Sequence, residues 1–274
     1  MVEISLKTLL LPAAAFAWVF TRILARVNSK ESSERTGTEV PAFGSGKMFD
    51  KFAQYYDMGN RFMSLGQDQS WRRALLQEAE VCSSDDLLDL ATGSADVAIA
   101  ASQLFGAKSV IGLDPSVQML KVGRTKVEEL KIENVQLVEG DAQAMPEFQK
   151  ERFDKITMSF GIRNVPDRTK ALMEMRRVIR NNANSRLAIM EFSAPPDGTI
   201  LGKVARLFVR HVVPFIGGVI TSAIEEYQYL EESIFKFPSP TEFAETIESC
   251  GFEMVRTVPL AAGVVNIYIA KPKH

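Results

Sequence analysis

The stretch LLDLATGSAD, residues 87–96, decides the fold. Its first four residues are apolar except for Asp89, which predicts a buried strand. A short turn around Gly93 follows, and residues 96–104 then carry apolar side chains at helical spacing. A strand that passes through a short turn into a helix is the beginning of a βαβ unit.

The same alternation of short apolar runs and helical patterns continues to residue 192. Parallel strands with helical crossovers form a doubly wound sheet, because each crossover is right-handed and packs its helix on one face. In such a sheet the ligand lies outside the carboxyl ends of the strands, near the point where the strand order reverses. We expect strands at residues 87–90, 109–113, Val135–Glu139, 155–160 and Arg186–Phe192, and helices at residues 96–104, 117–130 and 170–179.

The C-terminal part has a different pattern. Residues 242–250 predict a helix that ends at Gly251. The runs FEMVRTVPL, residues 252–260, and VVNIYIAK, residues 264–271, are rich in β-forming residues and separated by Ala-Ala-Gly, which predicts an antiparallel hairpin. We therefore expect an α/β fold with a mostly parallel seven-stranded sheet that ends in an antiparallel hairpin. By analogy between folds, this is typical of Rossmann-like methyltransferases rather than dehydrogenases.

Residues 87–96 also indicate which cofactor the turn accepts. A dinucleotide site needs the pattern G-x-G-x-x-G, because a pyrophosphate must approach bare backbone N–H groups at a helix N-terminus. Here a single glycine, Gly93, lies between Asp89 and Asp96, and two carboxylates would repel a pyrophosphate. They suit a ligand with an ammonium group, a sulfonium and a ribose diol. S-adenosyl-L-methionine has all three groups, so we expect this cofactor, with Asp89 and Gly93 in its site.

Polar residues follow at the ends of the next three expected strands. Asp114 can accept hydrogen bonds from the two ribose hydroxyls. Asp141 can accept from the adenine amino group, while the backbone N–H of Ala142 donates to the ring. Ser159 ends the fourth strand on the same side. Aspartates at such positions can also serve as helix caps and turn formers, but their repetition in register favours a ligand site.

Residues from about 48 to 271 resemble the ubiquinone/menaquinone biosynthesis C-methyltransferases, a family that methylates a ring carbon of a polyprenylated benzoquinol or naphthoquinol. The resemblance implies that Ser94 and the strand-end residues at 114, 141, 142 and 159 are cofactor-binding positions. The chain differs where the family usually has glycine (Ala95) or histidine (Asp68 and Tyr268). The matching stretches are FDKFAQYYDMGNRFMSLGQDQSW at 49–71, SFGIRNVPDRTKALMEMRRV at 159–178, EYQYLEESIFKFPS at 226–239 and GVVNIYIAK at 263–271.

The resemblance also implies catalytic candidates. Methyl transfer to carbon needs the ring carbon, the methyl group and the sulfur held in line. Arg163 cannot itself be a base at neutral pH, but it could stabilise the phenolate or orient a water molecule, and Asn164 could hydrogen-bond a quinol oxygen. Tyr56, together with Asp57, belongs to the N-terminal signature and could close over the site. The expected base is Asp68, if its family counterpart has that role, with Glu191 as an alternative.

An uncharged apolar run, LLLPAAAFAWVF at residues 9–20, sets the N-terminus apart. It is shorter than the roughly 20 residues that a spanning helix prefers, unless flanking residues join the span. Three interpretations stay open: a membrane anchor, a cleaved targeting peptide, and a helix packed on the domain. We divide the chain into this apolar targeting or anchor segment with its linker, residues 1–47, and a methyltransferase domain, residues 48–274.

The expected partners are a lipophilic quinol and a membrane surface. Residues 201–220, apolar with basic interruptions, fit either a helical lid that takes a prenyl tail at the membrane or an ordinary amphipathic helix. We expect association with the matrix side of the mitochondrial inner membrane, or alternatively a plastid location. A homodimer or a quinone-biosynthesis complex is compatible with such a place.

Composition excludes several other classes. The net charge of −2 and pI near 5.9 give no electrostatic case for a nucleic acid partner. Two cysteines and two histidines in 274 residues indicate neither a disulfide framework nor a metal site.

Two further functions remain open: a methyltransferase for another lipophilic small molecule, and a catalytically weakened scaffold subunit of a membrane complex.

Overall fold

The computed structural model describes residues 57, 60, 61, 64, 66–194 and 233–273. The expected anchor and linker at 1–47, the signature residue Tyr56 and the lid candidate at 201–220 lie outside these described residues. Among the helices that are described, none is long and apolar enough to cross a membrane.

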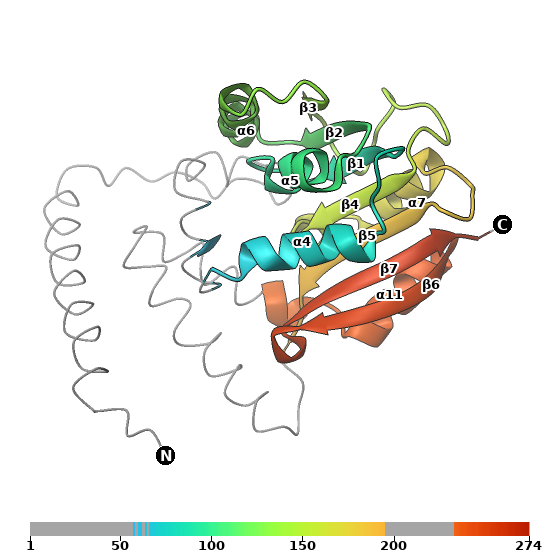
Figure 1. The fold of residues 1–274 in the computed structure, drawn as a ribbon. Coiled ribbons are helices and arrows are strands. Elements are labelled where there is room, and N and C mark those ends of the chain that lie inside the picture. The colour runs from blue at the N-terminus through green and yellow to red at the C-terminus, as the bar shows by residue number, and fades with distance from the viewer. Residues whose placement is uncertain (1–56, 58–59, 62–63, 65, 195–232, 274) are drawn as a thin grey trace, which may run out of the picture.

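The described part of the chain is built around one seven-stranded sheet (Figure 1). The strand order is β3-β2-β1-β4-β5-β7-β6, and β7 runs antiparallel to both of its neighbours. The order reverses at β1, which pairs with β2 on one side and with β4 on the other. The strands are β1 Asp86–Leu90, β2 Ser109–Asp114, β3 Val135–Glu139, β4 Lys155–Ser159, β5 Arg186–Phe192, β6 Phe252–Leu260 and β7 Val265–Pro272. This topology confirms the fold class predicted from the sequence.

Helices cover both faces of the sheet. On one face α4, α5 and α6 pack over Leu87, while α7 and α11 pack over Leu88 and Leu90 on the other. Adjacent residues of β1 thus face opposite cores, as the two-residue period of a strand requires. All five β1 residues are buried, which is typical of a central parallel strand. The helices are α4 Asp68–Glu78, α5 Asp96–Phe105, α6 Val117–Glu129, α7 Arg168–Val178 and α11 Pro240–Ser249.

Side-chain caps fix where three of these helices begin. The Ser116 hydroxyl accepts the Met119 N–H at the start of α6, and Asp167 caps α7 through the N–H of Lys170. At α11, Ser239 forms a full capping box three residues before a glutamate. Each cap stabilises its helix by about 1 kcal/mol, because it satisfies backbone N–H groups that have no partner within the helix.

The element boundaries differ from the expectation at two informative places. The helix expected at 170–179 is α7, Arg168–Val178, because Asp167 caps it earlier. The strand expected at 155–160 ends one residue sooner, since Phe160 has a left-handed φ of 57° that breaks the extended backbone. Helix α4 was not among the predicted elements.

Candidate active site

The turn that follows β1 is strained. Ala91, Gly93 and Ala95 have φ values of 50°, 56° and 68°, in the left-handed region where residues with a Cβ are costly. The Thr92 N–H donates to the Leu113 carbonyl at 3.1 Å, and the Ala95 N–H donates to the Thr92 carbonyl at 2.9 Å. Strain of this kind persists only where the surroundings impose it, and it clusters at functional sites.

Asp114, the last residue of β2, ties this turn to the neighbouring strand. Its Oδ2 accepts the N–H of Gly93 at 2.8 Å, and its Oδ1 accepts the N–H of Ser116 at 2.8 Å. Each carboxylate oxygen has a second lone pair, so the same side chain can also accept hydrogen bonds from ligand hydroxyls. The ribose contact expected of Asp114 stays a prediction.

Asp89 has a different role from the one expected of it. Its side chain is only 1% exposed, and its two oxygens accept the hydroxyl protons of Thr92 at 2.6 Å and Thr157 at 2.7 Å. Burial raises the pKa of Asp89 to about 7, against the lowering effect of these two hydrogen bonds. The Asp89 side chain thus holds the turn in place through its hydrogen bond with Thr92. A direct contact between Asp89 and a cofactor is not supported.

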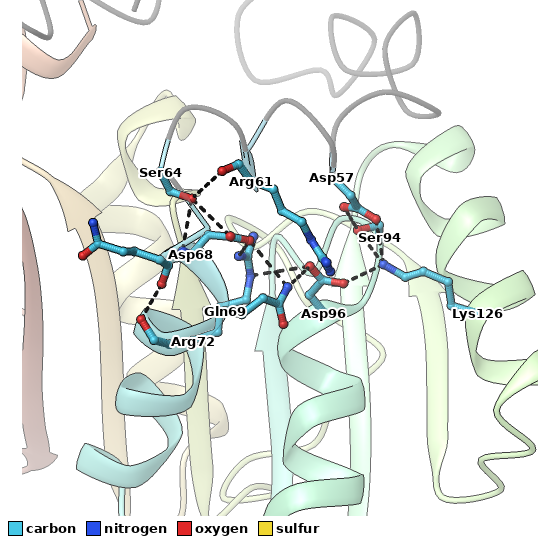
Figure 2. Close-up of polar contacts among 11 residues, drawn as sticks. Asp57, Arg61, Ser64, Asp68, Gln69, Arg72, Ser94, Asp96 and Lys126 are labelled. Carbon is cyan, nitrogen blue, oxygen red and sulfur yellow. Dashed lines mark hydrogen bonds and ion pairs between the residues drawn. The ribbon is translucent and has the colours of Figure 1, made fainter. Parts of the chain in front are cut away.

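Asp96, at the other end of the turn, is paired with cations (Figure 2). Its Oδ1 lies 2.6 Å from Nζ of Lys126, and its Oδ2 lies 3.9 Å from Nε of Arg72. Burial alone would raise the pKa of Asp96, but the charges of Lys126 and Arg72 hold it below its usual value. The two carboxylates were expected to suit a ligand with cationic groups, but Asp89 is buried and Asp96 is already paired with Lys126 and Arg72.

The hydroxyl of Ser94 belongs to the same polar network. It donates to Oδ1 of Asp57 at 2.5 Å and accepts from Nζ of Lys126 at 3.2 Å. Lys126 also lies 2.8 Å from Oδ2 of Asp57. The Ser94 hydroxyl, which was expected to contact the cofactor, is thus hydrogen-bonded to Asp57 and Lys126.

The same polar network continues into the first turns of α4. Gln69 Nε2 donates to Oδ2 of Asp96 at 3.1 Å, and Nη1 of Arg72 lies 2.6 Å from Oδ2 of Asp68. Asp68 is 3% exposed and also accepts the hydroxyl proton of Ser64 at 3.1 Å. Asp68, expected as a base, is thus a buried carboxylate with an arginine partner.

The ends of β3 and β4 complete this edge of the sheet. Asp141 is exposed and accepts the backbone N–H of Gln143 at 2.9 Å, while Ala142 is buried beside it. The buried hydroxyl oxygen of Ser159 has no hydrogen-bond partner among the described residues. A buried hydroxyl without a partner is costly unless a ligand or water satisfies it. Together with the acceptors at Asp114 and Asp141, this orphaned hydroxyl fits a ligand that carries several donors, as S-adenosyl-L-methionine does.

Arg163 lies in the short helix η1, Ile162–Asn164, directly after β4. Its Nη1 lies 2.6 Å from Oε1 of Glu191 and donates to the Phe160 carbonyl at 3.1 Å. The same glutamate accepts the Arg163 backbone N–H at 3.2 Å and the N–H of Phe192 at 2.8 Å. Glu191 is fully buried, so this ion pair fixes η1 between the ends of β4 and β5.

The turn that carries Arg163 touches the turn after β1. A Cβ added to Gly161 would lie only 2.5 Å from the Cβ of Ala91, so only glycine allows this approach. Nε of Arg163 is buried without a hydrogen-bond partner among the described residues, and its guanidinium lies 5.5 Å from the Phe192 ring centroid. The turn after β4, which carries Arg163, therefore lies against the turn after β1.

The remaining expected residues are placed as follows. Asn164 is partly buried at the end of η1, and its N–H donates to the Gly161 carbonyl at 3.0 Å. Tyr268 is fully buried in β7, where it packs edge-on against Phe243, and burial together with the charge of Glu191 raises its pKa. In the described residues no cluster of metal-ligating side chains occurs.

Sequence reasoning missed Lys126 and Arg72. Both are basic residues on helices whose acidic partners come from elsewhere: Asp96 lies 30 residues before Lys126, and Asp57 lies 69 residues before it. No local spacing rule connects residues so far apart. A basic residue on the apolar face of an amphipathic helix, as at Arg72, was the available signal.

Comparison with known proteins places the chain in a family. The profile of the ubiE/COQ5 methyltransferase family matches residues 38–271. A demethylmenaquinone methyltransferase of Thermus thermophilus is 38% identical over 222 residues, covering 81% of this chain and 98% of the relative. A ubiquinone/menaquinone biosynthesis C-methyltransferase UbiE of Citrifermentans bemidjiense is 37% identical, covering 81% and 93%.

A solved structure has the same fold. A SAM-dependent methyltransferase of Aquifex aeolicus superposes with a TM-score of 0.53 at 20% identity, covering 73% of this chain and 88% of that one. At this sequence identity the likeness shows the fold alone.

Proposed function

The chain belongs to the ubiE/COQ5 methyltransferase family, and on this premise we propose that it methylates a ring carbon of a polyprenylated benzoquinol or naphthoquinol in quinone biosynthesis. The enzyme is an S-adenosyl-L-methionine-dependent methyltransferase. The acceptor is proposed because the curated relatives named above carry names that refer to demethylmenaquinone or ubiquinone. A ring carbon of such a quinol becomes nucleophilic when its neighbouring phenol loses a proton.

The cofactor belongs at the carboxyl ends of the first four strands. When bound, S-adenosyl-L-methionine supplies an electrophilic methyl group on a positively charged sulfur. We propose that Gly93, Asp114, Asp141, Ala142 and Ser159 hold it, since these residues end or follow β1 to β4 at one edge of the sheet. The Ser94 hydroxyl contributes through the network around Lys126.

The acceptor belongs beside the η1 turn. A guanidinium group is a cation with no hydrogen-bond acceptor, so Arg163 suits the stabilisation of negative charge on the phenol oxygen rather than the acceptance of a proton. Because Glu191 already fixes the guanidinium, little reorganisation is needed when that charge develops. Asn164 offers a side-chain amide to a quinol oxygen from the same turn. The observation that carries the proposal is this guanidinium, fixed by Glu191 on a turn whose Gly161 lies against the cofactor turn.

The base is the least constrained part of the mechanism. Asp68 is buried and paired with Arg72, so it suits the support of α4 better than proton transfer. Glu191 accepts three N–H groups and is likewise committed. We propose that the phenol proton leaves to water, and that Tyr56 contributes to covering the acceptor.

The test of the acceptor is a substrate comparison with two variants. The purified enzyme with labelled cofactor should methylate a benzoquinol or a naphthoquinol acceptor, and a deletion strain should accumulate the demethylated quinone. Arg163→Lys keeps the charge but loses the planar fork, and should reduce turnover by roughly 10²-fold, the magnitude typical of losing one oriented donor. Arg163→Ala should abolish turnover and leave cofactor binding by calorimetry nearly intact. Equal loss of both would overturn the assigned role.

We further propose that the enzyme works at a membrane surface, on the matrix side of the mitochondrial inner membrane or in a plastid. The support is the apolar run at residues 9–20 and the lipophilic nature of the proposed acceptor. Membrane fractionation at physiological pH and salt, comparing the full chain with a chain that starts at residue 48, tests this. Recovery of both in the soluble fraction would contradict it.

A further inference from the structure

The ammonium group of Lys126 binds two parts of the chain that are distant from it in sequence, residue 57 and residues 94–96. It lies 2.8 Å from Oδ2 of Asp57, 2.6 Å from Oδ1 of Asp96 and 3.2 Å from Oγ of Ser94 (Figure 2). Lys126 belongs to the last turn of α6, Asp96 begins α5, and Ser94 lies in the turn between β1 and α5. One ammonium group thus uses its three donors on three partners.

These contacts hold the part of the turn around Ser94. Ser94 lies between Gly93 and Ala95, both in left-handed conformations. Its hydroxyl donates to Asp57 at 2.5 Å and accepts from Lys126, so the hydroxyl is bound on both sides. A strained turn is kept in one conformation only by such external contacts.

The charges show why a cation is needed at this position. Asp57 and Asp96 are both bound by the Lys126 ammonium group, and their side chains are 28% and 15% exposed. Without the ammonium group, two carboxylates would lie near each other, and Arg72, 3.9 Å from Asp96, would be their one remaining ion-pair partner among the described residues. Like charges so close repel, and the turn would have to move to separate them.

We propose that Lys126 is a positioning residue for the cofactor: by binding Asp57, Ser94 and Asp96 at once, it fixes the turn at residues 91–95 in the conformation that receives S-adenosyl-L-methionine. Its effect is on binding rather than on the methyl-transfer step, because among the described residues Lys126 makes no contact with η1, where the acceptor groups lie. Fixing the turn before the ligand arrives removes an ordering cost that would otherwise weaken binding. The proposal rests on the cofactor assigned under the proposed function, and it needs no assumption about the quinol.

Calorimetric titration of the full chain with S-adenosyl-L-methionine tests this directly. Lys126→Met keeps the length of the side chain and removes its charge, and should weaken the Kd by about tenfold, a loss near 1.4 kcal/mol. Lys126→Arg should restore the Kd to within about threefold of the parent, since it keeps the charge and several donors. The matched control is Lys121→Met on the same helix, where the lysine is exposed and forms no ion pair with any described residue, and it should leave the Kd unchanged.

A second variant identifies the partner. Asp57→Asn should also weaken cofactor binding, and adding it to Lys126→Met should cost less than the sum of the two single effects, because both act through one network. Asp57→Asn also serves if Lys126→Met fails to fold by circular dichroism. In the assay, KM for the cofactor should rise in Lys126→Met while kcat stays within about threefold, which a general loss of stability would not produce.

Two outcomes overturn the proposal. One is a Kd for Lys126→Met equal to that of Lys121→Met, and the other is strict additivity in the double variant. Failure of the quinol assignment is distinguishable, since the parent enzyme would then bind the cofactor normally and methylate no quinol.

Discussion

Two regions at the same edge of the sheet hold their charges differently. In the first region, Arg163 of η1 and Glu191 of β5 form an ion pair whose side chains are 8% and 0% exposed. Beside α5, Lys126 binds Asp57 and Asp96 with side chains that are 15% to 28% exposed. The second region is partly open to solvent, and the first is almost wholly buried. The acceptor side is therefore fixed once at folding, while the cofactor side is held by contacts that salt and solvent can weaken.

The largest expected effect comes from breaking the buried pair. Glu191→Ala should lower the free energy of unfolding by about 3–5 kcal/mol, because it leaves the Arg163 charge buried without a partner. Urea unfolding followed by circular dichroism measures this. The control is Glu253→Ala, which removes a pair with Lys271 on the exposed rim of the hairpin and should cost about 1 kcal/mol or less. Similar losses in both variants would show that burial does not separate the two kinds of pair.

The next effect concerns the buried carboxyl of Asp89 and its pH dependence. Its pKa is about 7 in the folded protein, above the value near 3.8 expected when unfolded, so the folded state binds the proton more tightly. The stability that this group contributes is complete below about pH 4 and is lost as the pH rises through 7. Relative to Asp89→Asn, the parent should lose roughly 2–3 kcal/mol between pH 5 and pH 8.

Unfolding experiments on both proteins at the two pH values check this prediction. Other carboxyl groups cancel in the difference, because both proteins share them. A difference that is constant with pH, or that grows in favour of the parent as the pH rises, would mean that Asp89 is already ionised in the fold.

A smaller effect is expected from the exposed network. Lys126→Met should lower the free energy of unfolding by about 1 kcal/mol or less at low salt, the range for partly exposed pairs. The difference should shrink in 1 M salt, where the screening length is only about 3 Å. The Glu191→Ala difference should survive the same salt. If both differences respond equally to salt, the two regions do not differ in solvent access.

The smallest effect is expected at Ala95, whose φ of 68° would suit glycine. Its methyl group is buried toward α6, where a Cβ on Gly123 would approach it to 3.1 Å. In Ala95→Gly the relief of backbone strain and the loss of a packed methyl group oppose each other, so stability should change by less than about 1 kcal/mol. The cofactor Kd should stay within about twofold by calorimetry. A Kd tightened tenfold would show that the methyl group crowds the cofactor.

The sequence predicted the sheet well because the relevant signals are local. The run at residues 87–90 is apolar throughout except for Asp89, and each following strand is bounded by helical spacing or by turn residues. The positions of Asp114, Asp141 and Ser159 at strand ends followed from the strands themselves. These parts of the site could be placed without knowing any long-range contact.

The sequence misjudged the charges of the turn because charge depends on partners. Asp89 and Asp96 look equivalent in the string DLATGSAD, yet one is buried under two hydroxyl groups and the other is bound by Lys126 and Arg72. The helix α4 was missed for a related reason. Arg72 interrupts its apolar face, and it is buried only because Asp68 and Asp96 surround it.

The placement of β7 has a consequence for how the enzyme is made. β7 follows every other strand in the chain, yet it lies inside the sheet between β5 and β6, with Asn266 opposite Glu191. Strands β1 to β3 can pair as soon as they are synthesised, whereas β5 keeps an open edge until β7 arrives. During translation the cofactor half of the site can therefore form first, and the glutamate that fixes Arg163 gains its final neighbour only when β7 is inserted.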